Sequence, residues 1–300
     1  MARREIRPRD RFEYGVVKLI QTLVCALPLG CARATGAGLG SLAWALGIRR
    51  EVVLGHLERV FGREKDEKER RRIARESYRN FGRMVFEYAR FPRLTPGLVE
   101  RLLTLSGAEH LDRAIEGGRG AIIVAGHFGN WELFATLATM GYPMTFLVGE
   151  QHNILVDGLM NALRARFGVE IAPLTENLRP IFRALRANRV VAMLSDQDAG
   201  RRGLFVDFLG LPASTPYGAA RFALATGAVL LPGAVVALGG GRHEIVISPA
   251  IEPPPEGLPA EERARRLTQA YTSVFEESIL RHPEQYFWMH RRWKTRPTAS

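Results

Sequence analysis

The chain has 300 residues, of which 46% are hydrophobic and 24% are charged, a composition that excludes fibrous and disordered proteins and can bury a sizeable core. Its net charge of +11 suggests an anionic partner: nucleic acid, a membrane surface, a phosphorylated substrate or an acidic protein. An arginine-rich genome is the alternative source of this charge. The two cysteines, Cys25 and Cys31, form neither a metal pattern nor a disulfide framework, which is typical of reduced thiols in a cytosol-facing protein.

The N-terminal segment carries a localisation signal. Residues 1–11 contain five arginines, and the apolar run that follows is interrupted by Gln21, Thr22 and Pro28. A spanning helix needs about 20 predominantly apolar residues, so this run predicts a helix that lies on a membrane surface or inserts shallowly, with its basic flank on the cytoplasmic side. A helix buried in the core of the main domain is the alternative. We expect residues 1–48 to form this basic anchor region and residues 49–300 to form a single domain.

The next segments predict helices and strands in alternation. The stretch from 62 to 91 has apolar residues at helical spacing, and Pro92 and Pro96 end it. Five apolar runs predict strands, at 121–125, 144–148, 190–194, 229–236 and 244–248. Helical patterns lie at 108–116, 130–140, 155–166, 178–187 and 215–226, and a final amphipathic helix follows the proline-rich connector 248–259. This alternation indicates an α/β fold with a central, mostly parallel sheet flanked by helices.

The stretch AIIVAGHFGNWE, residues 121–132, is the strongest candidate for a site. His127 follows a predicted central strand, at the sheet edge where open α/β sheets bind ligands. Flanking glycines let the backbone turn, and Asn130 is placed to cap the helix that opens there. Glu132, in the first turn, can then reach back to the imidazole and leave the other ring nitrogen free as a base. An ordinary strand-to-helix corner is the alternative interpretation.

The residues around His127 argue against two kinds of catalytic site, a metal centre and a covalent acyl-enzyme. No second histidine or cysteine lies at metal-ligand spacing in this segment, and no serine occupies a Gly-x-Ser-x-Gly elbow. Neither cysteine is near a histidine in sequence, so a covalent acyl-enzyme has no support. A lone base suits direct transfer from an activated donor such as a thioester to a hydroxyl. The oxyanion formed in that transfer needs N–H groups or a cation.

Several motifs carry a family resemblance. GHFGNWE resembles the His-x4-Asp/Glu motif of acyltransferases that acylate glycerolipids and lipid A. HPEQYFWMHRRWKTRP, residues 282–297, closely resembles the terminus of the late lipid A acyltransferases, the lauroyl and myristoyl transferases of Gram-negative bacteria. LSDQDAG (194–200) and residues 210–232 resemble the acidic motif and the helix–strand unit of that family. PPEG at 254–257 lacks the threonine of the glycerol-phosphate-type motif, which favours the lipid A branch and its relatives that acylate phosphatidylinositol mannosides.

The resemblance implies a role for individual residues. It assigns His127 as the base, Glu132 as its orienting partner, and Asp196 as a carboxylate that supports either the histidine or the acceptor, a role that Asp198 could share. A family arginine four residues before a glycine matches Arg164, with Arg166 as the second choice. Either would hold a lipid phosphate or the oxyanion. The stretch GEQHN, 149–153, departs from the basic residue that many relatives place there.

The resemblance also implies the function and the partners. The expected enzyme is an O-acyltransferase at the cytoplasmic face of the inner membrane, which moves a fatty acyl chain from acyl carrier protein or CoA to a hydroxyl of a lipid A precursor without a metal or redox cofactor. Arg291 and Arg292, with Lys294 and Arg296, would contact lipid phosphates or the acidic carrier protein. The alternatives are an acyltransferase for another glycolipid, a non-catalytic basic protein that binds membranes, and a hydrolase. No nucleic-acid-binding motif is present in the sequence.

Overall fold

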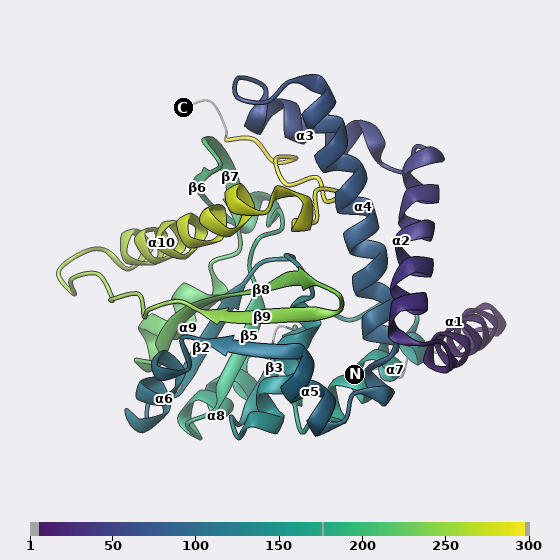
Figure 1. Cartoon of the computed structure of the whole chain (residues 1–300). Helices are drawn as coiled ribbons and strands as arrows, with labels where there is room; N and C mark the ends of the chain where they lie inside the picture. The colour runs from purple at the N-terminus through teal and green to yellow at the C-terminus, as the bar shows by residue number, and fades with distance from the viewer. Residues whose placement is uncertain (1–5, 176, 298–300) are drawn as a thin grey trace.

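A seven-stranded sheet forms the centre of the molecule in the computed structural model, which describes residues 6–175 and 177–297 (Figure 1). The strand order is β1-β9-β8-β2-β5-β3-β4, and every neighbouring pair is parallel except β8 and β9. The predicted α/β class with a mostly parallel sheet is therefore confirmed. The strands are β1 (Leu103–Ser106), β2 (Ala121–Ala125), β3 (Met144–Val148), β4 (Glu170–Pro173), β5 (Val190–Leu194), β8 (Val229–Gly239) and β9 (Arg242–Ile247).

Three predicted strands match β2, β3 and β5 residue for residue, and the last two match β8 and β9 approximately. The sequence analysis missed β1, β4 and a separate hairpin of β6 (Leu204–Phe208) and β7 (Leu211–Thr215). The edge strands β1 and β4 have only four residues each and keep partly exposed positions, so they produce no continuous apolar run.

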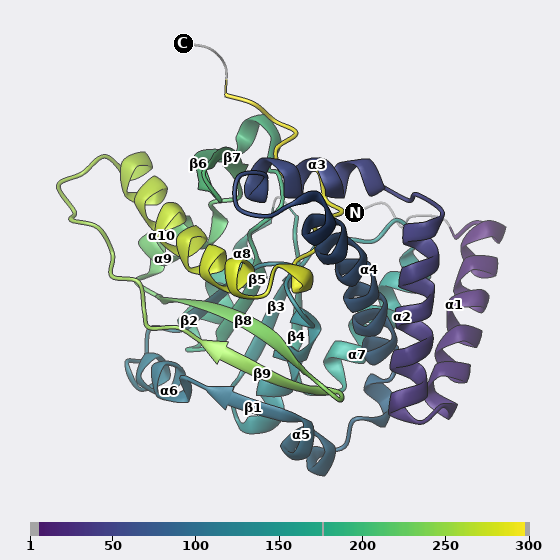
Figure 2. The same ribbon diagram turned by 45° about the horizontal axis from the view of Figure 1, so that its top comes forward.

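Ten α-helices surround the sheet in the described part of the chain (Figure 2). The predicted helix at 130–140 is instead a 3-10 helix, η2 (Trp131–Met140), and the one predicted from 215 begins later because β7 takes its first residue. The helices are α1 (Pro8–Ala26), α2 (Leu29–Ala45), α3 (Arg50–Phe61), α4 (Glu67–Ala89), α5 (Pro96–Leu102), α6 (Ala108–Glu116), α7 (Ile154–Ala165), α8 (Arg179–Arg186), α9 (Gly218–Thr226) and α10 (Ala260–Arg281).

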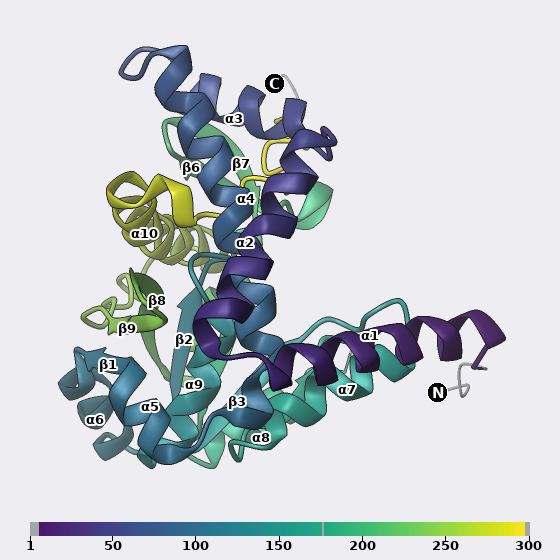
Figure 3. The ribbon, with the colours of Figure 1, turned by 45° about the vertical axis from the view of Figure 1, so that its right-hand side comes forward.

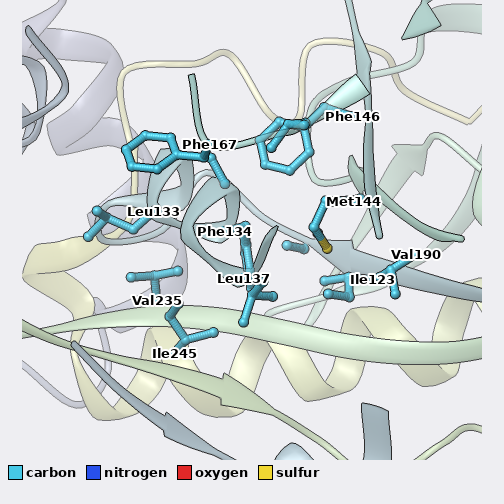
Figure 4. Packing of buried hydrophobic residues seen from close by; sticks show 14 of the residues in the cluster. Ile123, Leu133, Phe134, Leu137, Met144, Phe146, Phe167, Val190, Val235 and Ile245 are labelled. Atoms are coloured by element: carbon cyan, nitrogen blue, oxygen red, sulfur yellow. The ribbon is translucent and has the colours of Figure 1, made fainter. Parts of the chain in front are cut away.

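The central strand β2 is buried on both faces, which explains its unbroken apolar sequence. Its alternate residues point to opposite sides of the sheet and enter different clusters. Ile123 belongs to the cluster that contains the η2 residues Leu133, Phe134 and Leu137 (Figure 4), while Ile122 belongs to the cluster formed with residues of α8, α9 and α10. The residues that follow this strand are therefore held at the rim of a rigid core that lies on both faces of the sheet.

The N-terminal helices form a separate wall beside the sheet. Helix α2 lies along α4 in close contact, whereas α1 projects outward and lies beside α7 (Figure 3). Arg3 and Arg4 of the basic N-terminal cluster lie outside the described residues. Of the helices that the structure describes, none combines the length and the hydropathy needed to cross a bilayer.

The close approach of α2 and α4 depends on glycine. A Cβ atom added to Gly40 would overlap the carbonyl oxygen of Tyr78 in α4, and one added to Gly82 would overlap the carbonyl oxygen of Gly36. Gly38, in the same helix as Gly40, faces open space. The two backbones therefore meet directly at the first two positions, where only glycine fits without a shift of one helix.

We expect Gly40→Ala to lower the free energy of unfolding by about 1–3 kcal/mol, because the two helices must separate to admit the methyl group. Gly38→Ala is the matched control in the same helix. It should leave stability unchanged or raise it by about 0.5–1 kcal/mol, because alanine is the better helix former. Denaturant unfolding of the two variants checks this, and equal midpoints would rule out tight backbone packing at Gly40.

Helix α3 holds the C-terminal segment through a buried histidine. The Nδ1–H of His56 donates to the Trp288 carbonyl at 3.1 Å, and its ring packs edge-on against Trp293 with the centroids 4.9 Å apart. Burial lowers the pKa of His56 to about 4, and the nearby charge of Arg59 acts in the same direction. The folded protein therefore holds this ring in its neutral form at neutral pH.

This shift predicts a loss of stability in mild acid. In the unfolded chain His56 has a pKa of about 6.5, so it binds a proton below that pH. In the folded chain His56 stays neutral until the pH approaches 4, so acid favours the unfolded state. The contribution is full above pH 6.5 and declines as the pH falls. His56→Asn keeps a donor near the Trp288 carbonyl but does not titrate. Its free energy of unfolding should fall by about 1–2 kcal/mol less than that of the wild type between pH 7.5 and pH 5. Parallel pH profiles of the two proteins would contradict the buried neutral ring.

Candidate active site

Two neighbouring parallel strands bring a histidine and an aspartate together. His127 follows β2 by two residues, and Asp196 follows β5 by two residues, so both lie at the carboxyl edge of the sheet. The Nδ1 atom of His127 lies 2.7 Å from Oδ1 of Asp196, and the backbone N–H of His127 donates to Oδ2 at 2.9 Å. The aspartate is buried, while the imidazole side chain is 20% exposed. Asp196 thus contacts both the ring and the backbone of the histidine.

The charge of Asp196 decides which ring nitrogen of His127 carries the proton. Burial by itself raises the pKa of Asp196, but the charge and the hydrogen bonds of His127 outweigh it and hold the pKa below its usual range. A carboxylate only accepts hydrogen bonds, so Nδ1 of the neutral ring must carry the proton. The lone pair is then at Nε2. That atom lies 3.3 Å from the side-chain nitrogen of Gln197, a residue that the sequence analysis did not single out.

Glu132 does not contact His127, so its predicted role as the orienting partner is wrong. Its two carboxylate oxygens accept hydrogen bonds from Nε and Nη2 of Arg164 at 2.8 and 2.7 Å, and both side chains are buried. The segment after Asn130 is a 3-10 helix, which directs Glu132 towards α7 and away from the histidine. Of the two roles that the resemblance gave to Asp196, the contact with the histidine is the one present.

Arg164 is equally unavailable for the contacts expected of it. Its third nitrogen, Nη1, donates to Oδ1 of Asn161 at 2.8 Å, so every guanidinium nitrogen has a partner. The negative charge of Glu132 outweighs the effect of burial and raises the pKa of Arg164. The arginine therefore joins α7 to η2, and the expectation that it holds a phosphate or the oxyanion does not fit this geometry. Arg166, the second choice, lies exposed at the end of α7.

Asn130 is buried at the N-cap position of η2, but its side chain makes no cap hydrogen bond, contrary to the prediction. Its amide nitrogen instead donates to Oε2 of Glu87 in α4 at 2.8 Å. Glu87 also pairs with Arg33 of α2 and with Nε2 of His243 in β9, the latter at 3.0 Å. This buried cluster connects the N-terminal helices to the corner that carries His127.

The C-terminal segment, residues 282–297, completes the corner. The backbone N–H of Phe287 donates to the His127 carbonyl at 3.0 Å, and the N–H of Gly129 donates to the Gln285 carbonyl at 2.9 Å. Gly129 has φ 57°, and a Cβ atom there would overlap the carbonyl oxygen of Val235, so only glycine fits. The rings of Phe287 and Trp131 flank the imidazole.

The basic residues of this segment divide into two groups. Arg292 is only 1% exposed, donates to the Ser214 carbonyl at 2.6 Å and to the hydroxyl of Thr215, and lies over the ring of Phe208. Its predicted contact with lipid phosphates or a carrier protein is therefore wrong, because it is buried beneath the surface. Exposed cations remain at Arg291, Lys294 and Arg296.

Asp198 also makes hydrogen bonds that hold two segments of the chain together. Its carboxylate accepts hydrogen bonds from the backbone N–H and the hydroxyl of Thr295, at 3.2 and 2.9 Å, and so ties the C-terminal segment to the loop after β5. The backbone N–H of Asp198 donates to Nε2 of His290. Within the described part of the chain, no group of three or more histidine, cysteine, aspartate or glutamate side chains is arranged to hold a metal ion.

The contribution of the buried pair of Glu132 and Arg164 to the stability of the fold can be measured with variants. Glu132→Gln leaves the arginine buried without its counter-charge, which should lower the free energy of unfolding by about 3–5 kcal/mol. The double variant Glu132→Leu with Arg164→Met removes both charges and should recover most of that loss. Denaturant unfolding of both variants checks this. A wild-type midpoint for Glu132→Gln would show that the pair does not stabilise the fold.

The sequence of this chain is similar to those of known acyltransferases. The sequence profile of the family described as bacterial lipid A biosynthesis acyltransferase matches residues 9–295. The chain is 30% identical to the lipid A biosynthesis lauroyltransferase of Escherichia coli, over 92% of this chain and 89% of the relative. It is 29% identical to the palmitoleoyltransferase of the same organism, over 88% and 85%.

A relative whose name contains a glycolipid other than lipid A has a similar sequence identity to this chain. The phosphatidylinositol mannoside acyltransferase of Mycobacterium tuberculosis is 31% identical over 73% of this chain and 68% of its own length. The family profile covers nearly the whole sequence, from α1 to the C-terminal segment that surrounds His127. The chain is therefore an acyltransferase and belongs to the bacterial lipid A biosynthesis acyltransferase family.

Proposed function

We propose that this enzyme transfers a fatty acyl chain from a thioester to a hydroxyl of a lipid A precursor, with His127 as the general base. The observation that carries the proposal is the hydrogen-bonded pair of Asp196 and His127, which leaves the lone pair on Nε2, the ring nitrogen opposite the one that Asp196 binds. The aspartate holds the ring in one tautomer and stabilises the imidazolium that forms during the reaction.

The reaction follows from this geometry in two steps. The acceptor hydroxyl gives its proton to Nε2 of His127 as its oxygen attacks the thioester carbonyl carbon, and the carbonyl electrons move to the oxygen to form an oxyanion. When the carbonyl re-forms, the carbon–sulfur bond breaks and the thiolate takes the proton from the imidazolium. Cys25 lies in α1 and Cys31 in α2, away from His127, which supports direct transfer without an acyl-cysteine intermediate.

The acceptor assignment depends on the extent of the similarity. Identity with the lauroyltransferase extends over 92% of the chain, while that with the phosphatidylinositol mannoside acyltransferase extends over 73%, which favours a lipid A precursor. An acceptor of the mannoside class is the second candidate, because the identity is as high over the matched region. The donor in our proposal is acyl carrier protein, with acyl-CoA as the alternative, and no metal or redox cofactor takes part.

The exposed cations near the C-terminus support an anionic partner. Arg291, Lys294 and Arg296 have no ion-pair partner among residues 6–175 and 177–297. They belong to the C-terminal segment and follow Phe287, whose N–H donates to the His127 carbonyl. An acidic carrier protein docked on these side chains would deliver its thioester close to the base.

The outer surface of α1 supports attachment to a membrane. Its large apolar side chains are exposed, and Arg7, Arg9 and Arg11 lie at its beginning. A helix of this kind lies in the interface and presents its basic residues to anionic headgroups. We propose that residues 1–48 associate with the cytoplasmic face of the inner membrane and present residues 49–300 to the lipid acceptor. The most exposed apolar side chains of α1 are Phe12, Leu19, Ile20 and Leu23.

The test of this function is acyl transfer by the purified enzyme. Wild-type protein receives acyl carrier protein or CoA thioesters together with a lipid A precursor or a phosphatidylinositol mannoside, and mass spectrometry identifies the acylated lipid. His127→Ala and Asp196→Asn should lower turnover by about 10²–10⁴-fold, because the base is lost or held in the wrong tautomer.

The melting temperature of each variant serves as the control for folding. Full activity of both variants would exclude the proposed base. Release of free fatty acid without any acylated acceptor would identify a hydrolase instead.

A further inference from the structure

The corner that carries His127 has no backbone donor left for an oxyanion among its three central residues. The N–H of His127 donates to Asp196 at 2.9 Å, that of Phe128 to the Gly126 carbonyl at 2.8 Å, and that of Gly129 to the Gln285 carbonyl at 2.9 Å. Acyl transfer develops negative charge on the carbonyl oxygen, which active sites stabilise with preorganised donors. Under the proposed function, the donor must come from another group.

The two buried arginines of this region are also engaged. Arg164 donates to Glu132 and Asn161, and Arg292 donates to the backbone of Ser214 and the hydroxyl of Thr215. If Arg164 turned towards the substrate, it would leave the buried carboxylate of Glu132 unpaired, which costs several kcal/mol. Nε of Arg292 has no hydrogen-bond partner among the described residues, but this side chain is only 1% exposed and lies beneath the surface.

Gln197 places an amide donor within hydrogen-bond distance of Nε2 of the base. It follows Asp196 directly, is only partly buried, and places its amide nitrogen 3.3 Å from Nε2 of His127. Because Nε2 carries the lone pair, the amide must present its NH2 group to the ring. A separation of 3.3 Å is long for a hydrogen bond, so an incoming hydroxyl can displace the amide at little cost.

We propose that Gln197 is a further catalytic residue, whose amide N–H donates to the oxyanion during acyl transfer. The inference rests on the proposed function. The acceptor hydroxyl, once it donates to the lone pair of Nε2, has displaced the amide N–H of Gln197. As the hydroxyl proton moves to Nε2, the thioester carbonyl oxygen, two bonds from the attacking oxygen, takes up negative charge. Rotation of the glutamine side chain directs its displaced N–H to this oxyanion.

The amide suits this task because it is uncharged. It can follow the reacting atoms without leaving a buried charge unpaired, unlike Arg164 or Arg292. A purely protective role predicts different behaviour, since a glutamine that only covers the resting base competes with the acceptor hydroxyl. Removing such a cover would leave turnover unchanged or raise it.

The experiment compares the steady-state kinetics of wild type, Gln197→Met and Gln197→Glu. The donor is an acyl carrier protein thioester, and the readout is the amount of acylated lipid formed. Gln197→Met keeps the shape of the side chain without its donor, and should lower kcat about 10²–10³-fold with little change in KM or melting temperature. Gln197→Glu should lower kcat at least as far, because its carboxylate repels the oxyanion. Gln269→Met, at a partly buried glutamine of α10 that contacts Asp207, is the matched control and should keep wild-type kcat.

The outcomes separate this inference from the proposed function. If wild type is active, His127→Ala is inactive and Gln197→Met keeps kcat within about threefold, the oxyanion role is wrong and the base assignment stands. A faster Gln197→Met variant, or a loss confined to KM, overturns the oxyanion role as well. If wild type transfers no acyl chain to either lipid, the proposed function fails and the inference fails with it.

Discussion

The candidate site depends on the parallel pairing of β2 with β5. That register places Ala125 beside Leu194, so the two strands end at the same edge of the sheet. His127 and Asp196, each two residues further on, therefore lie side by side. The buried carboxylate binds both the ring and the backbone N–H of the histidine. A shift of either strand by one residue would turn one of these side chains to the opposite face. The chemistry of the site therefore depends on the rigidity of a core buried on both faces.

The buried polar groups around this site bind one another and the backbone, and so connect the elements that surround it. Glu132 with Arg164 joins η2 to α7, while Arg292 joins the C-terminal segment to β7. Each charge is buried and hydrogen-bonded, as the low dielectric of an interior requires. The C-terminal segment in turn pairs with the backbone of the corner on both sides of Phe128. Residues more than 150 positions apart in sequence thus hold the imidazole in place.

Much of the architecture could be predicted from the sequence. The apolar runs of β2, β3 and β5 are visible because both of their faces are covered, and α4 is visible because it buries one stripe. The hairpin of β6 and β7 was missed because its pattern mixes Pro212 and Asp207 with apolar residues, and only its last residue, Thr215, fell within a predicted element, the helix at 215–226. His127 was identified because a glycine-rich corner follows a buried strand. Gln197 was not, because nothing local distinguishes it from a solvated turn.

The α/β class, the central strands and the histidine at the carboxyl edge can be predicted from the amino-acid sequence, because apolar periodicity and turn residues are local properties of the chain. The carboxylate that binds the imidazole is apparent only in the folded molecule. Glu132 is five residues from His127 and Asp196 is 69 residues away, yet Asp196 makes the contact. Helix geometry turns the near carboxylate towards Arg164, and strand pairing brings the distant one beside the ring. Partner choice is set by the three-dimensional path of the backbone, which spacing along the sequence does not record.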